Sequence, residues 1–119
     1  MNKTVLKKSA WGKEDIKNWI KEHAGEYLMK RVEVKEMMNL PMHREATAKA
    51  LEHAEKTLRE QNRNESGEWL VERQVAAYFI MPKDERDNAA DSDMLYAVIE
   101  IEKEMEELIE KIQALKAND

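Results

Sequence analysis

The sequence predicts a mainly α-helical protein, with a three-helix N-terminal domain followed by a long C-terminal coiled-coil helix. Apolar residues recur at intervals of three and four along most of the chain, which is the spacing of one face of an α-helix. Charged residues make up 38% of the sequence and fall between the apolar positions, as expected for amphipathic helices around a core. With 119 residues, the chain is long enough for one compact domain and an appended element.

Three helices are predicted in the N-terminal domain, residues 1–81. The first covers residues 13–28 with a bend near Gly25, and the second covers residues 32–40 and is ended by Pro41. The third follows from Arg44 to Gln61, where strong helix formers separate the apolar positions. The apolar faces consist of Ile16, Trp19, Ile20, Tyr27 and Leu28, of Val34, Met37, Met38 and Leu40, and of Thr47, Ala50, Leu51, Ala54 and Leu58.

Residues 69–81 admit two interpretations. β-Branched and aromatic residues at both ends favour a β-hairpin with strands at 69–71 and 77–80. A helix fits nearly as well. The residues that would share its face are Leu70, Gln74, Ala77 and Met81. Residues 82–92 have no apolar periodicity and are predicted to be a linker.

The strongest pattern lies in residues 93–117, where apolar residues alternate steps of four and three through three heptads. This seven-residue repeat predicts a helix that self-associates into a homodimer or a small bundle. The alternative is a single amphipathic helix that packs on its own domain. The predicted oligomerisation residues are Met94, Val98, Ile101, Met105, Leu108, Ile112 and Leu115.

The charges beside this repeat indicate how two such helices would pair. A parallel pair would place Lys111 against Lys116 of the other chain, which is repulsive. It would also leave Glu104 facing Ile109. An antiparallel pair brings glutamates at the front of one helix near lysines at the back of the other, so an antiparallel or bundle-like dimer is expected.

The sequence contains no recognisable catalytic or cofactor-binding motif. The absence of cysteine excludes disulfides and thiolate chemistry, and His23, His43 and His53 are not spaced as metal ligands. The three glycines form no phosphate-binding loop, and no serine is accompanied by a residue that could serve as its general base. We therefore expect a protein that acts by binding, with no enzymatic activity, no cofactor and no metal.

The sequence also bears on location. No apolar run approaches the roughly 20 residues that cross a membrane, and residues 1–10 lack the apolar core of a signal peptide. A chain without cysteine needs no oxidising compartment. The expected location is the cytoplasm, and no membrane partner is expected.

Charge is distributed unevenly along the chain, whose formal net charge is −5. Residues 1–63 contain 14 Lys and Arg against 10 Asp and Glu, whereas residues 64–119 contain 6 against 15. Such a division suits a basic half that meets a polyanion and an acidic half that avoids it. The alternative is an unevenly charged, solvated surface.

Residues 34–51, VKEMMNLPMHREATAKAL, combine a short helix, a tight turn at Asn39-Leu40-Pro41 and a longer helix. With residues 13–28 as a preceding helix, this layout resembles the winged helix-turn-helix family of bacterial and phage regulators. The C-terminal helix is similar to the dimerisation helix of PadR-like members. The resemblance implies a small dimeric regulator that acts by occupying a DNA site, with a hairpin at 69–81 as its wing.

The resemblance also implies which residues contact double-stranded DNA. The second helix of the motif enters the major groove, and Arg44 at its start is the candidate for a bidentate contact to guanine. Lys49 and Lys56 lie further along and would reach phosphates. The implied DNA-binding residues are His43, Arg44, Thr47, Lys49, Lys56 and Arg63. Further candidates are Ala48, His53, Lys7, Lys8, Lys30 and Arg31.

A second hypothesis is a helical adaptor or inhibitor, of phage or mobile-element type, that binds a host protein. The eight methionines suit an adaptable apolar contact surface. Salt dependence distinguishes the two hypotheses, because binding through phosphates weakens steeply as salt increases and an apolar interface does not.

Overall fold

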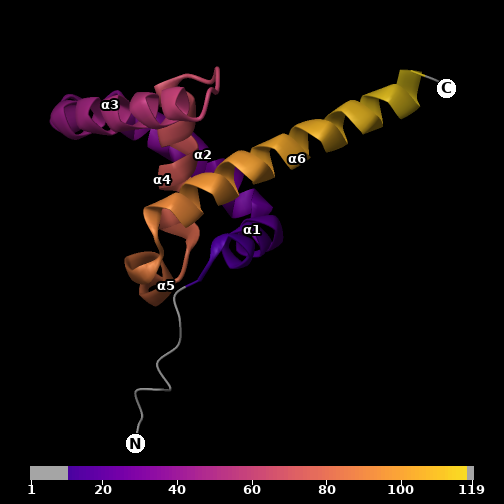
Figure 1. Cartoon of the computed structure of the whole chain (residues 1–119), viewed down its shortest axis with the longest axis horizontal. Coiled ribbons are helices and arrows are strands. Elements are labelled where there is room, and N and C mark those ends of the chain that lie inside the picture. Colours follow the sequence, from indigo (N-terminus) through magenta and orange to yellow (C-terminus); the bar gives the residue numbers. More distant parts are fainter. Residues whose placement is uncertain (1–10, 118–119) are drawn as a thin grey trace, which may run out of the picture.

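The computed structural model describes residues 11–117, which form α-helices and one short 3₁₀ helix joined by brief turns. The elements are α1 (Lys13–Glu22), α2 (Ala24–Met38), η2 (Pro41–His43), α3 (Arg44–Glu60), α4 (Gly67–Ile80), α5 (Lys83–Asn88) and α6 (Asp91–Ala117), as shown in Figure 1. Residues 11–117 contain no β-strand, so the predicted mainly helical class is confirmed for this part of the chain.

The central helix is α4, which packs against α2, α3 and α6. Ser66 begins it as the N-cap residue, and its hydroxyl accepts a hydrogen bond of 3.1 Å from the backbone nitrogen of Trp69. Apolar residues are distributed around α4 rather than along one side, as expected when neighbours cover several faces. The buried residues of α4 are Gly67, Leu70, Val71, Ala76, Ala77 and Ile80.

The β-hairpin predicted within residues 69–81 is wrong, because α4 runs through both proposed strands. Between the two proposed strands lie Glu72, Arg73 and Gln74, which are strong helix formers and not turn-forming residues. The β-branched and aromatic residues on either side serve packing against the neighbouring helices instead of strand pairing. The part of the chain that the structure describes therefore contains no wing.

The start of α4 lies very close to α3. Gly67 is buried there, and a Cβ atom at this position would lie 2.6 Å from Cγ of Glu55 and 3.1 Å from the carbonyl oxygen of Leu51. A Cβ would therefore displace the Glu55 side chain and press on the backbone of α3. Gly67 permits the close approach.

The helix predicted over residues 13–28 is divided at His23, whose φ of −122° and ψ of 36° depart from helical geometry. The imidazole of His23 stacks on the indole of Trp19 with ring centroids 3.9 Å apart. After this break α2 runs without interruption to Met38. The short helix predicted over residues 32–40 is therefore the second half of a longer one.

Other helix boundaries follow the local sequence more closely. Leu40 is extended, with φ −80° and ψ 136°, as expected for a residue that precedes proline, and α2 has ended before Pro41.

The predicted linker, residues 82–92, instead contains α5. The C-terminal helix begins at Asp91, two residues earlier than predicted.

The first half of α6 lies in the same hydrophobic core as the helices that precede it. Val98 and Ile101 are fully buried, as are Ile16 of α1 and Leu70 of α4. α1 packs along α6, and α4 packs against it from another side. The predicted boundary at residues 82–92 therefore does not separate two units, because α6 completes the core.

Beyond this core, α6 continues as an isolated helix (Figure 1). Every residue from 106 to 117 is exposed, and the Cα atoms of the molecule extend over 63 × 38 × 28 Å. None of the helices within residues 11–117 is both long and apolar enough to cross a membrane.

Candidate interaction surfaces

The seven-residue repeat of α6 is divided between the core and the solvent. Its buried members are Met94, Val98 and Ile101, and Met105 lies partly buried at the edge of the core. The later members are exposed: Leu108 by 58%, Ile112 by 45% and Leu115 by 69%. Packing on the chain's own domain, one of the two interpretations of this repeat, thus applies to its first half.

We call residues 105–117 the α6 tail. Ile109, which is 54% exposed, lies beside the repeat and widens its apolar face. Four large aliphatic side chains thus form a continuous stripe on the tail. The tail itself extends away from the core (Figure 1). Contiguous exposed apolar surface of this kind marks an interaction site more often than scattered apolar residues do.

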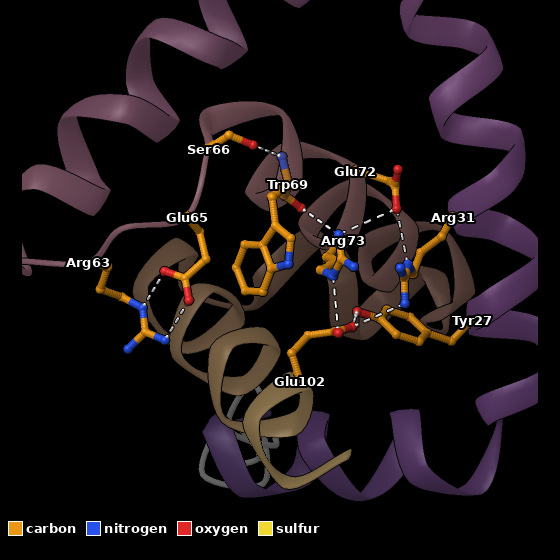
Figure 2. A network of polar contacts seen from close by, with 9 residues as sticks. All are labelled: Tyr27, Arg31, Arg63, Glu65, Ser66, Trp69, Glu72, Arg73 and Glu102. Carbon is orange, nitrogen blue, oxygen red and sulfur yellow. Dashed lines mark hydrogen bonds and ion pairs between the residues drawn. The ribbon is translucent and has the colours of Figure 1, made fainter. Parts of the chain in front are cut away.

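A partly buried ionic network holds α6 at the point where it leaves the core (Figure 2). The hydroxyl of Tyr27 donates a 2.7 Å hydrogen bond to Oε2 of Glu102, and Nε of Arg73 lies 3.1 Å from Oε1 of Glu102. Arg31 contacts both acidic residues, with Nε 3.1 Å from Glu72 and Nη1 3.4 Å from Glu102. Two guanidinium groups therefore balance two carboxylates across α2, α4 and α6.

The members of this network are largely withdrawn from solvent. The side chains of Glu102, Arg73 and Arg31 are 11%, 13% and 20% exposed. Burial, together with the negative charge of Glu102, raises the pKa of Tyr27 well above its ordinary value, so Tyr27 remains a hydrogen-bond donor. Because each carboxylate is bound by arginine, the network serves structure rather than proton transfer.

A second ionic cluster joins three lysines of α1 to two glutamates of α6. Nζ of Lys17 lies 2.9 Å from Glu100 and 2.8 Å from Glu104. Nζ of Lys13 lies 2.8 Å from Glu100. Nζ of Lys21 lies 3.1 Å from Glu104. Because the residue numbers rise together in these pairs, α1 and α6 run in the same direction.

The lysines and glutamates of this cluster stabilise each other's charged forms. Hydrogen bonds from Lys13 and Lys17 hold the pKa of Glu100 below its ordinary value, and those from Lys17 and Lys21 do the same for Glu104. The hydrogen bonds to Glu104 and then Glu100 raise the pKa of Lys17 well above its ordinary value. The cluster therefore remains charged at neutral pH and fastens α1 to α6.

The outer surface of α3 carries three of the predicted DNA-binding residues, Arg44, Lys49 and Lys56, all exposed. The helix contains four basic residues, Arg44, Lys49, Lys56 and Arg59, and four acidic residues, Glu45, Glu52, Glu55 and Glu60. The formal charge of α3, apart from His53, is therefore zero. Affinity for DNA comes largely from neutralised phosphates, so the acidic residues oppose binding at this surface.

The remaining predicted DNA-binding residues do not share this surface. Arg63 follows α3, and its guanidinium group donates two hydrogen bonds of 3.1 Å to the carboxylate of Glu65 (Figure 2). His43 and Thr47 are partly buried and line a groove between helices. Among the further candidates, Ala48 and His53 are exposed on α3, and Arg31 belongs to the partly buried network. Nζ of Lys30 lies 3.1 Å from Glu33, and Lys7 and Lys8 lie outside the described residues.

That groove is shallow and apolar, and it is formed where α2, α3 and α4 meet. Its volume of about 230 Å³ is below that of most small-molecule sites and suits one or two side chains of another polypeptide. Leu40 and Met42, in the turn before α3, are exposed nearby in the sequence. The lining residues are Val34, Met37, Met38, His43, Ala46, Thr47, Ala50, Val71, Val75 and Phe79.

The helices assigned to the helix-turn-helix, α2 and α3, both pack against α4. The resemblance gives this supporting role to the helix that precedes them, but α1 packs mainly along α6. No family model, curated protein or solved structure matches the chain. Within residues 11–117, no group of three His, Cys, Asp or Glu residues is arranged to hold a metal ion.

Neither ionic cluster is predicted from the sequence. Lysines four residues apart in α1 and glutamates four residues apart in α6 are a visible signal for the cluster around Lys17. Pairing the two sets requires knowledge that α1 lies along α6, which the sequence does not provide. The network around Glu102 joins three helices distant in sequence and has no comparable signal.

Proposed function

We propose that the chain is a helical adaptor, a protein without catalytic activity that acts by binding other polypeptide chains, including a second copy of itself. The exposed apolar stripe of the α6 tail is the observation that carries this proposal. When a second helix covers large aliphatic side chains at helical spacing, the burial of their apolar surface lowers the free energy. The apolar groove between α2, α3 and α4 supports binding of a further partner protein.

Binding of double-stranded DNA by a dimeric regulator is the second candidate function. Exposure of Arg44, Lys49 and Lys56 on α3 favours it. A dimer formed through the α6 tail would present two such helices to half-sites about one turn of DNA apart. The four glutamates of α3 repel phosphates at the same surface, so the adaptor is the better supported function.

The oligomeric state tests the adaptor proposal. We expect light scattering and sedimentation to show a wild-type dimer at micromolar concentrations. Leu108→Asp places one carboxylate per chain in the stripe, and burying two of them costs about 2–6 kcal/mol of association free energy. The dissociation constant should therefore rise roughly 30-fold or more.

Ala114→Asp is the matched control, because Ala114 is exposed on the face of the tail opposite the stripe. It adds the same charge to the same part of α6 and should leave the dimer intact. Circular dichroism should show that both variants are folded, since both positions lie outside the core. A wild-type chain that remains monomeric, or a Leu108→Asp dimer as strong as the wild type, contradicts the proposal.

A further inference from the structure

We propose that the α6 tail binds the α6 tail of a second copy in antiparallel orientation, with Met105 of each chain against Leu115 of the other. This inference rests on the proposed self-association and specifies its geometry. The pairing places the end of each α6 at the edge of the other chain's core.

The position of the core along α6 excludes a parallel partner on the stripe. Val98 and Ile101 lie on the same face of α6 as Leu108 and Ile112, and the chain's own core covers them. A parallel partner helix would continue towards its N-terminus along this face, into the volume that the core fills. An antiparallel partner instead continues along the tail in the direction away from this core.

The length of the tail fits the antiparallel arrangement. α6 ends at Ala117, two residues after Leu115. With Leu115 opposite Met105, Ala117 lies beside residue 103 of the other copy, where the core begins. Ile109 of the two chains then meet next to the two-fold axis. The pairing gives four apolar layers, two of Met105 with Leu115 and two of Leu108 with Ile112.

The charges beside the stripe favour the same orientation. In the antiparallel register Lys116 lies near Glu106 of the second copy, and the symmetry repeats this attraction. Lys111 approaches its own counterpart near the axis, where Glu107 lies one turn away in each chain. A parallel pair would instead repeat the repulsion between Lys111 and Lys116 twice.

Cysteine cross-linking tests this geometry directly, because the sequence contains no cysteine. Met105→Cys and Leu115→Cys are prepared as full-length single variants, and each is oxidised alone and after mixing. Only the mixture should give a covalent dimer. In either variant alone the two introduced cysteines are about ten residues apart along the helices, roughly 15 Å, whereas a disulfide requires Cα atoms within about 7 Å.

Ala114→Cys, on the opposite face of the tail, measures background cross-linking, and light scattering shows whether each variant is a dimer before oxidation. Mass spectrometry identifies the mixed disulfide. Cross-linking of Leu115→Cys alone above background would show parallel pairing and overturn the inference. Dimers that give no mixed disulfide also overturn it but leave self-association standing. A chain that never dimerises removes the proposed self-association as well.

Discussion

At the scale of single residues, Glu102 binds two neighbouring helices at the point where the buried part of α6 ends. Its carboxylate binds Tyr27, Arg31 and Arg73, which belong to α2 and α4. In the sequence Glu102 is one of several glutamates beside an apolar repeat, so periodicity gives it no special role. Only the fold reveals that its neighbours are cationic and that its side chain is withdrawn from solvent.

Glu102→Gln should destabilise the fold far more than Glu110→Gln. Glutamine preserves the size of the side chain but leaves Arg31 and Arg73 with one carboxylate, Glu72, between them. Removing one partner of a buried pair costs about 3–5 kcal/mol, and partial exposure reduces the expected loss to about 2–3 kcal/mol. Glu110 is exposed in the tail, so its replacement should cost less than about 0.5 kcal/mol. Equal midpoints of urea unfolding for the two variants would contradict this role for Glu102.

Acidification should weaken the attachment of α1 to α6. The pKa values of Glu100 and Glu104 lie below their ordinary value of 4.5 in the folded chain, first because of hydrogen bonds from lysine. Their stabilisation is fully present above that value and is lost as the pH falls through the folded pKa values. The raised pKa of Lys17 matters only in alkali, above its ordinary value of 10.5.

Thermal unfolding followed by circular dichroism measures this dependence. A variant with both Glu100→Gln and Glu104→Gln should be less stable than the wild type at about pH 7 and should lose less stability on transfer to about pH 3. The control replaces Glu52 of α3 and Glu110 of the tail, both exposed and away from the stripe, with glutamine and should follow the wild type. An acid dependence of the first variant identical to that of the wild type would show that the cluster contributes nothing.

At the scale of helices, the sequence predicts best the elements that have one solvated side. The third predicted helix corresponds closely to α3, because its apolar stripe faces the core and its other side faces water. α4 has no such contrast, since its neighbours cover several faces, and the hairpin was an equally reasonable interpretation. The division between α1 and α2 involves the stacking of His23 on Trp19, a contact that periodicity does not encode.

The two helical glycines should respond to alanine with opposite signs. Gly25→Ala introduces a Cβ that meets nothing within 4 Å, so the better helix propensity should stabilise the fold by up to about 1 kcal/mol. Gly67→Ala gains the same propensity but places its Cβ against Glu55 and the backbone of Leu51. We expect a net loss of about 1–3 kcal/mol in denaturant unfolding. A stabilised Gly67→Ala variant would show that Glu55 and the backbone of α3 accommodate the added Cβ without a net cost.

The DNA-binding hypothesis makes a distinct prediction for α3. Arg44→Ala should reduce discrimination at one base pair by about 1–3 kcal/mol, whereas Lys49→Ala and Lys56→Ala should weaken binding to all duplexes alike. Each lysine variant should also lower the slope of log affinity against log salt by about one. Titration of labelled duplex fragments at several salt concentrations measures both effects. No retardation by the wild type at about 50 mM salt would eliminate this candidate function.

At the scale of the whole molecule, the two halves of α6 should behave differently when they are removed. Deletion of residues 106–119 should leave a folded monomer, because residues 106–117 are exposed. Deletion of residues 93–119 should prevent folding, since it removes Met94, Val98 and Ile101 from the core. Three such losses at about 2–5 kcal/mol each compare with a total stability of about 5–15 kcal/mol.

Circular dichroism and light scattering distinguish these outcomes. The seven-residue repeat shows that α6 has a continuous apolar face, but it does not show which part the chain itself covers. A folded monomer formed by residues 1–92 would mean that the first half of α6 is dispensable for the core. An unfolded chain of residues 1–105 would mean that the tail contributes to folding.

The length of α6 beyond the core has a consequence for how tightly a dimer could hold its targets. The helices that line the groove, α2, α3 and α4, lie away from the tail (Figure 1). We therefore expect tail pairing to leave the groove open in both copies. An antiparallel dimer is therefore bivalent, with two identical grooves at a separation fixed by two stiff helices. A target that carries two matching apolar segments at that separation would gain avidity, because its second attachment is intramolecular. A target that carries only one such segment would occupy a single groove and would bind without this gain in avidity.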